Sequence, residues 1–167
     1  MPITSRSEYG MRAMILLAEQ PRDELLSASE LSRREHIPLK YLEQLLSELK
    51  KGGLVVSFPG ARGGYRLARA PEQVTVGEVV RALDGAFAPM SCVHDGPDRT
   101  PCAFEEGCKL RPLWSRLYKA VHGVLDETSL SQLAHSTPRD RAPLPSPPEI
   151  EIAEPPNTQC GAIYLLQ

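Results

Sequence analysis

The sequence predicts a mainly α-helical fold built on a winged helix-turn-helix with a small β-hairpin wing, followed by a cysteine loop and a long helix. Two short helical patterns joined by a tight turn occupy residues 27–51, and the second has a wholly polar outer face. Two strand patterns follow directly, over residues 54–58 and 65–68. Because a hairpin directly after a helix-turn-helix is typical of a wing, residues 1–70 are predicted to form a winged helix.

Length and composition favour one soluble domain or one domain with an appendage, since 41% of the 167 residues are apolar and 24% are charged. No apolar run approaches the roughly 20 residues that span a bilayer. The N-terminus lacks the apolar core of an export signal, so we expect a cytoplasmic protein with no membrane contact. In that compartment, closely spaced cysteines more often serve metal or redox chemistry than disulfides.

The net charge of −2 hides an uneven distribution. Residues 1–70 contain 11 Lys and Arg against 8 Asp and Glu, a local charge of +3. Residues 71–167 contain 8 against 13, a local charge of −5. The basic N-terminal half permits a phosphate backbone as a partner without requiring one.

The first helix is predicted from about Ser5 to just before Pro21, because apolar residues recur there with the spacing of one helical face. These residues are Met11, Met14, Ile15 and Ala18. A capping box at Ser27 and Glu30 predicts a second helix that ends near Arg34.

The third helix is predicted from Pro38, which suits a first helical position, to about Lys51, before two glycines. One face is rich in leucine and the opposite face is polar, as in the second helix of a helix-turn-helix. The polar face consists of Lys40, Glu43, Gln44, Ser47 and Lys51.

The glycine-rich connection between the two strands, residues 59–64, has one basic residue, Arg62, near its tip. A connecting helix is predicted over 75–84, because Thr75 and Glu78 have the spacing of a capping box. Its expected buried face consists of Val76, Val79, Val80 and Leu83.

Residues 86–109 are expected to form an irregular loop that contains three of the four cysteines. A long helix is predicted from Pro112 to about Asp126, with a short capped helix after it from Thr128 to Ala134. The apolar residues of the long helix step by 4, 3, 4 and 3, which fits either a seam with a partner helix or an ordinary core face. These residues are Leu110, Trp114, Leu117, Val121 and Val124.

Residues 136–167 differ in composition, since seven of the sixteen prolines lie between Pro138 and Pro156. Such a tail is expected to be disordered or polyproline-like. Its apolar end, residues 162–166, is expected to dock on this chain or on another protein.

Three cysteines, Cys92, Cys102 and Cys108, are spaced C-x9-C-x5-C, so their thiolates can converge on one point. Thiolate ligation suits zinc or an iron–sulfur cluster. Zinc sites usually contain a tight C-x2-4-C pair, which is absent, and a three-cysteine loop without an obvious fourth ligand favours a cluster. Three unligated thiols are the alternative.

A fourth ligand must come from elsewhere in the sequence. His94 lies inside the loop, although a solvated histidine is the commoner interpretation. His122 is expected at a surface or interface, and Cys160, in the tail, is expected to be a bystander. Glu8 would ordinarily be a solvated carboxylate.

These motifs, in this order, resemble the Rrf2 family of bacterial transcription regulators over roughly residues 2–134. The resemblance rests on the cysteines and on the segments LKYLEQLL (39–46), KGGL (51–54), GARGGY (60–65) and VGEVV (76–80). It implies a homodimer that binds a double-stranded DNA operator and whose helices in residues 110–134 form the dimer interface.

The resemblance also implies that the third helix enters the major groove and that the wing reaches toward the minor groove. The residues expected to face DNA are then Lys40, Tyr41, Glu43, Gln44 and Arg62. Gln44 would pair with adenine and Glu43 would accept from cytosine or repel a wrong base. Lys40 is assigned to phosphate, and Arg62 to phosphate or the minor groove.

At two positions the sequence differs from the IscR-like members, so their DNA specificity and their cluster ligands cannot be assigned to this chain. Pro59 stands where those members have the arginine that leads the wing turn, so sequence specificity does not carry over. Arg111 stands where they have a cluster-binding histidine, which excludes that ligand set. In some NsrR-like members an acidic residue at the position of Glu8 reaches from the partner subunit. Glu8 is therefore the first candidate for the fourth ligand, ahead of His94, water or a small thiol.

The predicted function is that of a transcriptional repressor that senses iron, redox state or nitric oxide through one 4Fe-4S or 2Fe-2S cluster per subunit. An intact cluster would fix the loop 92–108 against the partner's first helix, and its loss would change the spacing of the recognition helices. The alternative is a cluster-free thiol or zinc switch on the same fold. An enzyme is not expected, because no P-loop, Rossmann glycine pattern or catalytic triad is present.

Overall fold

The computed structural model describes residues 4–60, 62–93, 99–100, 102 and 107–136. The chain divides into two units, Met1–Ser136 and Thr137–Gln167, and the second unit lies outside the described residues. The expectations for the proline-rich tail, Cys160 and His94 therefore stay predictions. No helix among the described residues is long and apolar enough to cross a membrane.

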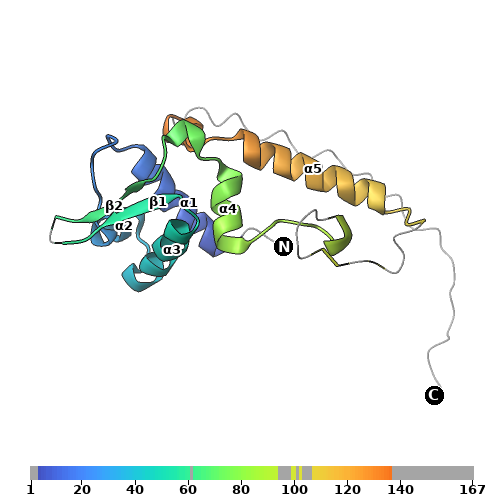
Figure 1. The fold of residues 1–167 in the computed structure, drawn as a ribbon, viewed down its shortest axis with the longest axis horizontal. Helices are drawn as coiled ribbons and strands as arrows, with labels where there is room; N and C mark the ends of the chain where they lie inside the picture. Colours follow the sequence, from blue (N-terminus) through green and yellow to red (C-terminus); the bar gives the residue numbers. More distant parts are fainter. Residues whose placement is uncertain (1–3, 61, 94–98, 101, 103–106, 137–167) are drawn as a thin grey trace, which may run out of the picture. The chain divides into compact units, whose positions relative to one another are not determined.

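The described residues form a mainly helical fold with one two-stranded antiparallel sheet, which confirms the predicted fold class (Figure 1). In chain order the elements are α1 (Ser5–Ala18), α2 (Ala28–Glu35), α3 (Leu39–Lys51), β1 (Val55–Phe58), β2 (Gly64–Leu67), η1 (Pro71–Gln73), α4 (Val76–Asp84), η2 (Ser91–Val93), α5 (Arg111–Glu127) and α6 (Leu130–Ala134). The two η elements are 3-10 helices.

The N-terminal caps explain where most helices begin. Thr4 caps α1 through its side chain, which accepts from the backbone N–H of Arg6. Thr75 and Glu78 form the complete capping box predicted for α4. In α2 only half of the box is present, since Ser27 accepts from the Glu30 N–H while the Glu30 carboxylate binds arginines.

Several helix starts differ from the prediction by one or two residues, and α5 begins at Arg111, one residue before the predicted Pro112. Pro38 is the N-cap of α3 rather than its first residue, because its ψ of 126° is extended. Thr128 ends α5, and its hydroxyl donates to the Val124 carbonyl. Ser129 is therefore the cap of α6, in a capping box with Gln132.

The wing hairpin pairs Val55 with Leu67 and Phe58 with Gly64. The return strand begins one residue earlier than predicted, at Gly64, because Gly64 pairs with Phe58. Leu26 adds a further bridge to Tyr65 with hydrogen bonds of 3.1 and 2.8 Å. A Cβ at Gly64 would stand 2.6 Å from the Leu26 carbonyl oxygen, so only glycine admits this close approach.

The core lies between α1, α2, α3, α4 and the base of the hairpin. It is rich in leucine, and each fully buried leucine contributes roughly 1.5–3 kcal/mol of transfer free energy. Its largest fully buried side chains include Met14, Leu31, Leu42, Leu45, Leu46 and Leu49. Of the predicted α4 face, Val79, Val80 and Leu83 are buried, whereas Val76 is half-buried at the junction with Thr128.

Helix α5 contacts α4 and η2 but buries none of its residues. Much of its apolar side faces solvent, with Leu110 56%, Leu113 54%, Leu117 41% and Val124 67% exposed. The alternative of an ordinary intramolecular core face is therefore wrong for most of this helix. An exposed apolar face of this extent is typical of a helix that packs against a partner.

Candidate nucleic-acid interface and cysteine site

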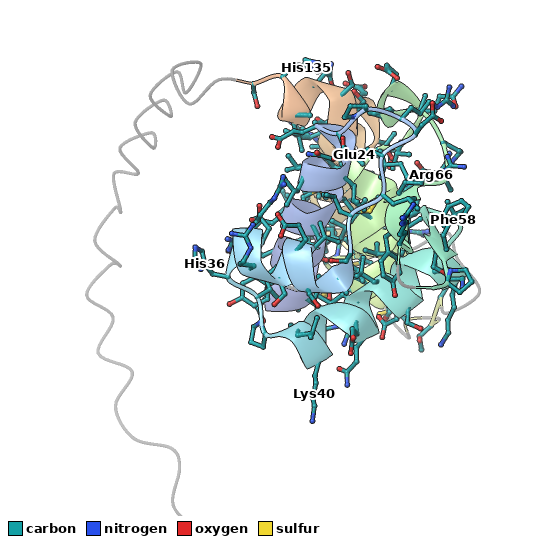
Figure 2. The ribbon with its side chains drawn as sticks, turned by 90° about the vertical axis from the view of Figure 1, so that its left-hand side faces the viewer. Glu24, His36, Lys40, Phe58, Arg66 and His135 are labelled. Atoms are coloured by element: carbon teal, nitrogen blue, oxygen red, sulfur yellow. The ribbon has the colours of Figure 1, made fainter. Side chains whose placement is uncertain are left out.

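The outer face of α3 is set by the burial of its leucine face. Lys40, Glu43 and Gln44 are exposed, and Figure 2 shows Lys40 pointing away from the ribbon. Pro38 is exposed before the first turn, so the N-terminal end of α3 is open to a large partner. This is the end of a recognition helix that contacts base edges in helix-turn-helix proteins.

Tyr41 differs from its polar neighbours because it is half-buried. Its ring packs against the core and meets the Tyr9 ring edge to face, with centroids 6.1 Å apart. Its apolar body therefore fixes α3 against α1. Only its exposed part is left for a ligand.

The tip of the wing is a tight turn with an exposed basic side chain. Gly60 has a φ of +104°, and the Gly63 N–H donates to the Gly60 carbonyl at 2.9 Å. A Cβ at Gly63 would stand 2.1 Å from the Phe58 carbonyl oxygen. Arg62 lies exposed between these two glycines.

Two further basic residues of this surface were not predicted from the sequence. The Arg66 guanidinium lies 5.2 Å from the centroid of the exposed Phe58 ring. Figure 2 shows these two residues as neighbours. Lys50, near the end of α3, donates to the Ser57 hydroxyl of β1 at 2.6 Å. The strand pattern of the sequence predicts that Arg66 lies in the hairpin. Its contact with Phe58 depends on which residues of the two strands are paired, and this pairing is known only from the structure.

The three cysteines of the predicted site are free thiols. Cys92 is buried on η2, where this short helix meets α5, and Cys102 and Cys108 are half-buried. Beside Cys92 lies a cavity of about 400 Å³. Its lining consists of Cys92, Val93, Arg99, Arg111, Ser115, Tyr118 and Lys119.

The described residues contain no group of three or more His, Cys, Asp or Glu side chains placed to hold a metal ion. The expected convergence of the three thiolates is thus not seen in this part of the chain. Residues between the cysteines, 94–98 and 103–106, lie outside the described residues. Glu8, the candidate fourth ligand, is exposed on the first turns of α1.

The donor chemistry nevertheless fits an iron–sulfur cluster. Three free thiols belong to one short segment, and soft thiolates are the ligands that such clusters prefer. The cavity beside Cys92 is lined by cationic side chains, including Lys119 and Arg111, which would offset the negative charge of a thiolate-ligated cluster.

Helix α4 links the cysteine segment to the winged helix through a polar junction at its C-terminal end. Asp84, with 8% of its side chain exposed, accepts from the Thr4 backbone N–H at 3.1 Å and from the Thr4 hydroxyl at 2.7 Å. Arg6 donates to the Leu83 carbonyl and forms an ion pair with Glu48 of α3.

The pKa values at this junction follow from the same contacts. Burial alone would raise the pKa of Asp84, but the neighbouring Ser7 and Thr4 and the charge of Arg6 hold it below its usual value. Hydrogen bonding to Glu48 raises the pKa of Arg6. The Ser7 hydroxyl is buried in the same place without a well-oriented hydrogen bond.

A second junction ties α5 to the segment that leads to Cys92. His122 Nε2 lies 2.8 Å from the Phe87 carbonyl oxygen, and its ring stacks at a tilt on Tyr118. His122 is half-buried in this contact, although the sequence placed it at a surface or an interface. One turn later, Asp126 accepts from Arg81 of α4 at 2.7 Å.

Comparison with known proteins agrees with this architecture. Residues 3–136 match the model of the Rrf2 family, described as an iron-dependent transcriptional regulator. The chain is 37% identical over 137 residues to the transcriptional regulator CymR of Bacillus subtilis, covering 82% of this chain and 92% of the relative. It is 35% identical over 139 residues to IscR of Aliivibrio salmonicida, covering 80% and 77%.

Solved structures give the same result. The structure of B. subtilis CymR, described as the global cysteine regulator of that organism, aligns with a TM-score of 0.69 and 34% identity over 82% of this chain and 98% of that chain. The oxidised form of Staphylococcus aureus CymR aligns with a TM-score of 0.63 and 31% identity, with coverages of 82% and 98%.

Proposed function

Because this chain belongs to the Rrf2 family of transcriptional regulators, we propose that it binds a double-stranded DNA operator as a homodimer and represses transcription under the control of an iron–sulfur cluster. The observation that carries the cluster is the set of three free thiols in the segment between α4 and α5, one of them at a cavity with cationic walls. Sensing rather than catalysis, in the bacterial cytoplasm, is the role proposed for this site.

The exposed face of α3 supports the DNA contacts. Gln44 is proposed to pair with adenine and Glu43 to accept from cytosine, since both are exposed. Lys40 is exposed in the first turn of α3 and is proposed to contact phosphate, and Arg62, exposed at the wing tip, is proposed to contact the minor groove or phosphate. Tyr41 is proposed to contact DNA only through its exposed edge, since its ring is packed on Tyr9.

The apolar side of α5 supports the homodimer. Its exposed residues continue the spacing of a heptad seam, so a second copy of the helix would cover them. Pairing two such helices places the two recognition helices at a fixed separation. That separation decides which half-site spacing a dimer reads.

Cys92, Cys102 and Cys108 are the proposed cluster ligands, and Glu8 of the partner subunit is the proposed fourth, ahead of His94. When bound, the cluster would act as the sensor, because its integrity depends on iron, oxygen or nitric oxide. The carboxylate of Glu8 would bind iron less tightly than a thiolate does, so it would be the weakest of the four ligands. Lys119, which lines the cavity beside Cys92, would offset part of the negative charge of a thiolate-ligated cluster.

Anaerobic purification followed by an absorption spectrum and assays of iron and sulfide tests the cluster. We expect a broad band near ~400 nm from a cluster ligated by Cys92, Cys102 and Cys108. Cys102→Ala is expected to lose this band while the dimer stays folded, and Cys160→Ala, the matched control, is expected to keep it. A Cys102→Ala protein with unchanged absorbance and cluster stability would contradict the ligand assignment.

A thiol switch without a cluster is the second candidate. It is supported by the similarity to CymR, whose S. aureus relative has been solved in an oxidised form. This candidate predicts a colourless anaerobic protein, containing zinc or no metal, in which oxidation of the same cysteines changes DNA affinity. The absorption spectrum and the iron assay distinguish the two candidates.

A further inference from the structure

Arg6, in the first turn of α1, joins three parts of the fold. Its guanidinium forms an ion pair with Glu48 on α3, and its Nε donates to the Leu83 carbonyl at 3.3 Å. The same Nε lies 3.9 Å from Asp84 Oδ1. One side chain therefore connects the recognition helix to the C-terminal end of α4.

The end of α4 is also where the cysteine segment begins. Gly85, with a φ of +80°, ends the helix, and only residues 86–90 separate it from η2 and Cys92. The hydrogen bonds from Thr4 to Asp84 fix the start of α1 at the same point. A displacement of the cysteine segment therefore acts directly on Asp84 and on its neighbour Arg6.

The connecting segment is held from its other side by α5. His122 contacts the Phe87 carbonyl oxygen at 2.8 Å, and Asp126 binds Arg81 in the middle of α4. These contacts hold the connecting segment and the middle of α4 against α5. The C-terminal end of α4, where Arg6 donates to the Leu83 carbonyl, leads directly into the cysteine segment.

We propose that Arg6 is the positioning residue that transmits the state of the cysteine site to the recognition helix. When the cysteine segment changes state, the end of α4 shifts, and Arg6 carries the shift to Glu48 and thus to α3. This inference rests on the proposed function, in which the cysteine segment holds the sensing group. It assigns to Arg6 a role in coupling, not in contact with DNA or cluster.

The chemistry of arginine suits this role. A planar guanidinium has five N–H donors in a fixed fork, so it can serve the Glu48 carboxylate and the Leu83 carbonyl at the same time. A lysine ammonium keeps the charge but does not reproduce that geometry. Arg6→Lys therefore weakens the link while the charge of α1 stays the same.

Arg12 provides a matched control on the same helix. It is 40% exposed against 37% for Arg6, and it also serves two acceptors, the Glu35 carboxylate at 2.9 Å and the Glu35 carbonyl at 2.7 Å. These acceptors belong to α2, not to the cysteine segment. Arg12→Lys thus makes the same chemical change without touching the proposed link.

Amide hydrogen exchange of α3 in the cluster-loaded and cluster-free full-length protein tests the proposal. In the wild type, we expect loading to change the exchange rates of α3 amides about fivefold or more, the low end of usual coupling strengths. In Arg6→Lys the ratio of the two rates is expected to fall to near one, with cluster absorbance and dimer mass unchanged. Arg12→Lys is expected to behave as the wild type.

A wild-type ratio in Arg6→Lys overturns the proposal, and so does a loaded wild type whose α3 exchanges like the cluster-free form. If Arg6→Lys does not fold, Glu48→Gln removes the same ion pair from the other side and is measured instead. A wild type that binds no cluster contradicts the proposed function rather than this link. In that case the wild type, Arg6→Lys and Arg12→Lys are compared with reduced and with oxidised cysteines. The ratio of the α3 exchange rates in these two states then tests the role of Arg6 in the same way.

Discussion

The carboxylate of Asp126 in α5 lies against Gly77 in the first turn of α4, so closely that a Cβ at Gly77 would stand 2.0 Å from Asp126 Oδ1. The same oxygen accepts from Arg81 at 2.7 Å. Because residue 77 has no side chain, α5 approaches α4 closely at this point.

In Gly77→Ala the added Cβ must displace the Asp126 carboxylate and the Arg81 guanidinium, which are the ends of flexible, partly exposed side chains, and so break their ion pair. We therefore expect the roughly 1 kcal/mol gained in helix propensity to be largely offset by the loss of this ion pair, which is worth up to about 1 kcal/mol. The free energy of unfolding in urea measures the net effect. In an Asp126→Ala background no ion pair is lost, and the same substitution should be stabilising.

Gly123→Ala in α5 is the control for helix propensity alone. Among the described residues, a Cβ at Gly123 has no heavy atom within 4 Å. The substitution should raise the free energy of unfolding by up to about 1 kcal/mol. Equal effects of Gly77→Ala and Gly123→Ala would show that the contact with Asp126 does not constrain α4.

The fold was predictable where the signal is local. The polar face of α3 and the cap at Thr75 depend on residues three or four apart, and both were predicted. The bridge from Leu26 to the wing and the contact of Arg6 with Glu48 depend on chain segments far apart in sequence. No periodicity encodes such contacts, so they were missed.

In the candidate site, too, local features were predictable and tertiary contacts were not. The exposure of Lys40 and Gln44 follows from helical periodicity, whereas the packing of Tyr41 on Tyr9 depends on tertiary contact. The spacing of the cysteines indicates that their thiolates can meet. Spacing in a loop contains no information on whether they do, because a loop of nine residues permits many end-to-end distances.

Acidification should destabilise the protein partly through Asp84. Its pKa is lowered in the folded state, so its stabilising contribution is complete above its ordinary pKa of about 4 and is lost as the pH falls through the folded-state value. Asp84→Asn should lower the free energy of unfolding at pH 7 and flatten its dependence on pH below about 4. Urea unfolding from pH 7 to pH 2.5 measures this, with the exposed Glu19→Gln as the control for lost charge.

A single charge on the apolar side of α5 should abolish the proposed dimer. Leu117 lies in the middle of the exposed row, 41% exposed, and a buried unpaired carboxylate there would cost several kcal/mol. Leu117→Glu should therefore halve the mass measured by light scattering and leave the helical circular dichroism intact. Arg116→Glu, at the neighbouring exposed position, should keep the wild-type mass. A dimeric Leu117→Glu would place the interface elsewhere.

Lys40 and Gln44 should affect DNA binding in different ways, because one is assigned to phosphate and the other to a base edge. Lys40→Ala removes one phosphate contact per subunit and two per bound dimer, so the slope of log affinity against log salt should decrease by about 1.8 on any duplex. Gln44→Ala should leave that slope unchanged and instead relax the base preference at one position of each half-site, where about 1–3 kcal/mol of discrimination is lost per contact. Salt titrations on a random duplex measure the first effect, and selection from a randomised pool measures the second. If Lys40→Ala keeps the wild-type slope while Gln44→Ala keeps the wild-type sequence preference, α3 is not the helix that reads DNA.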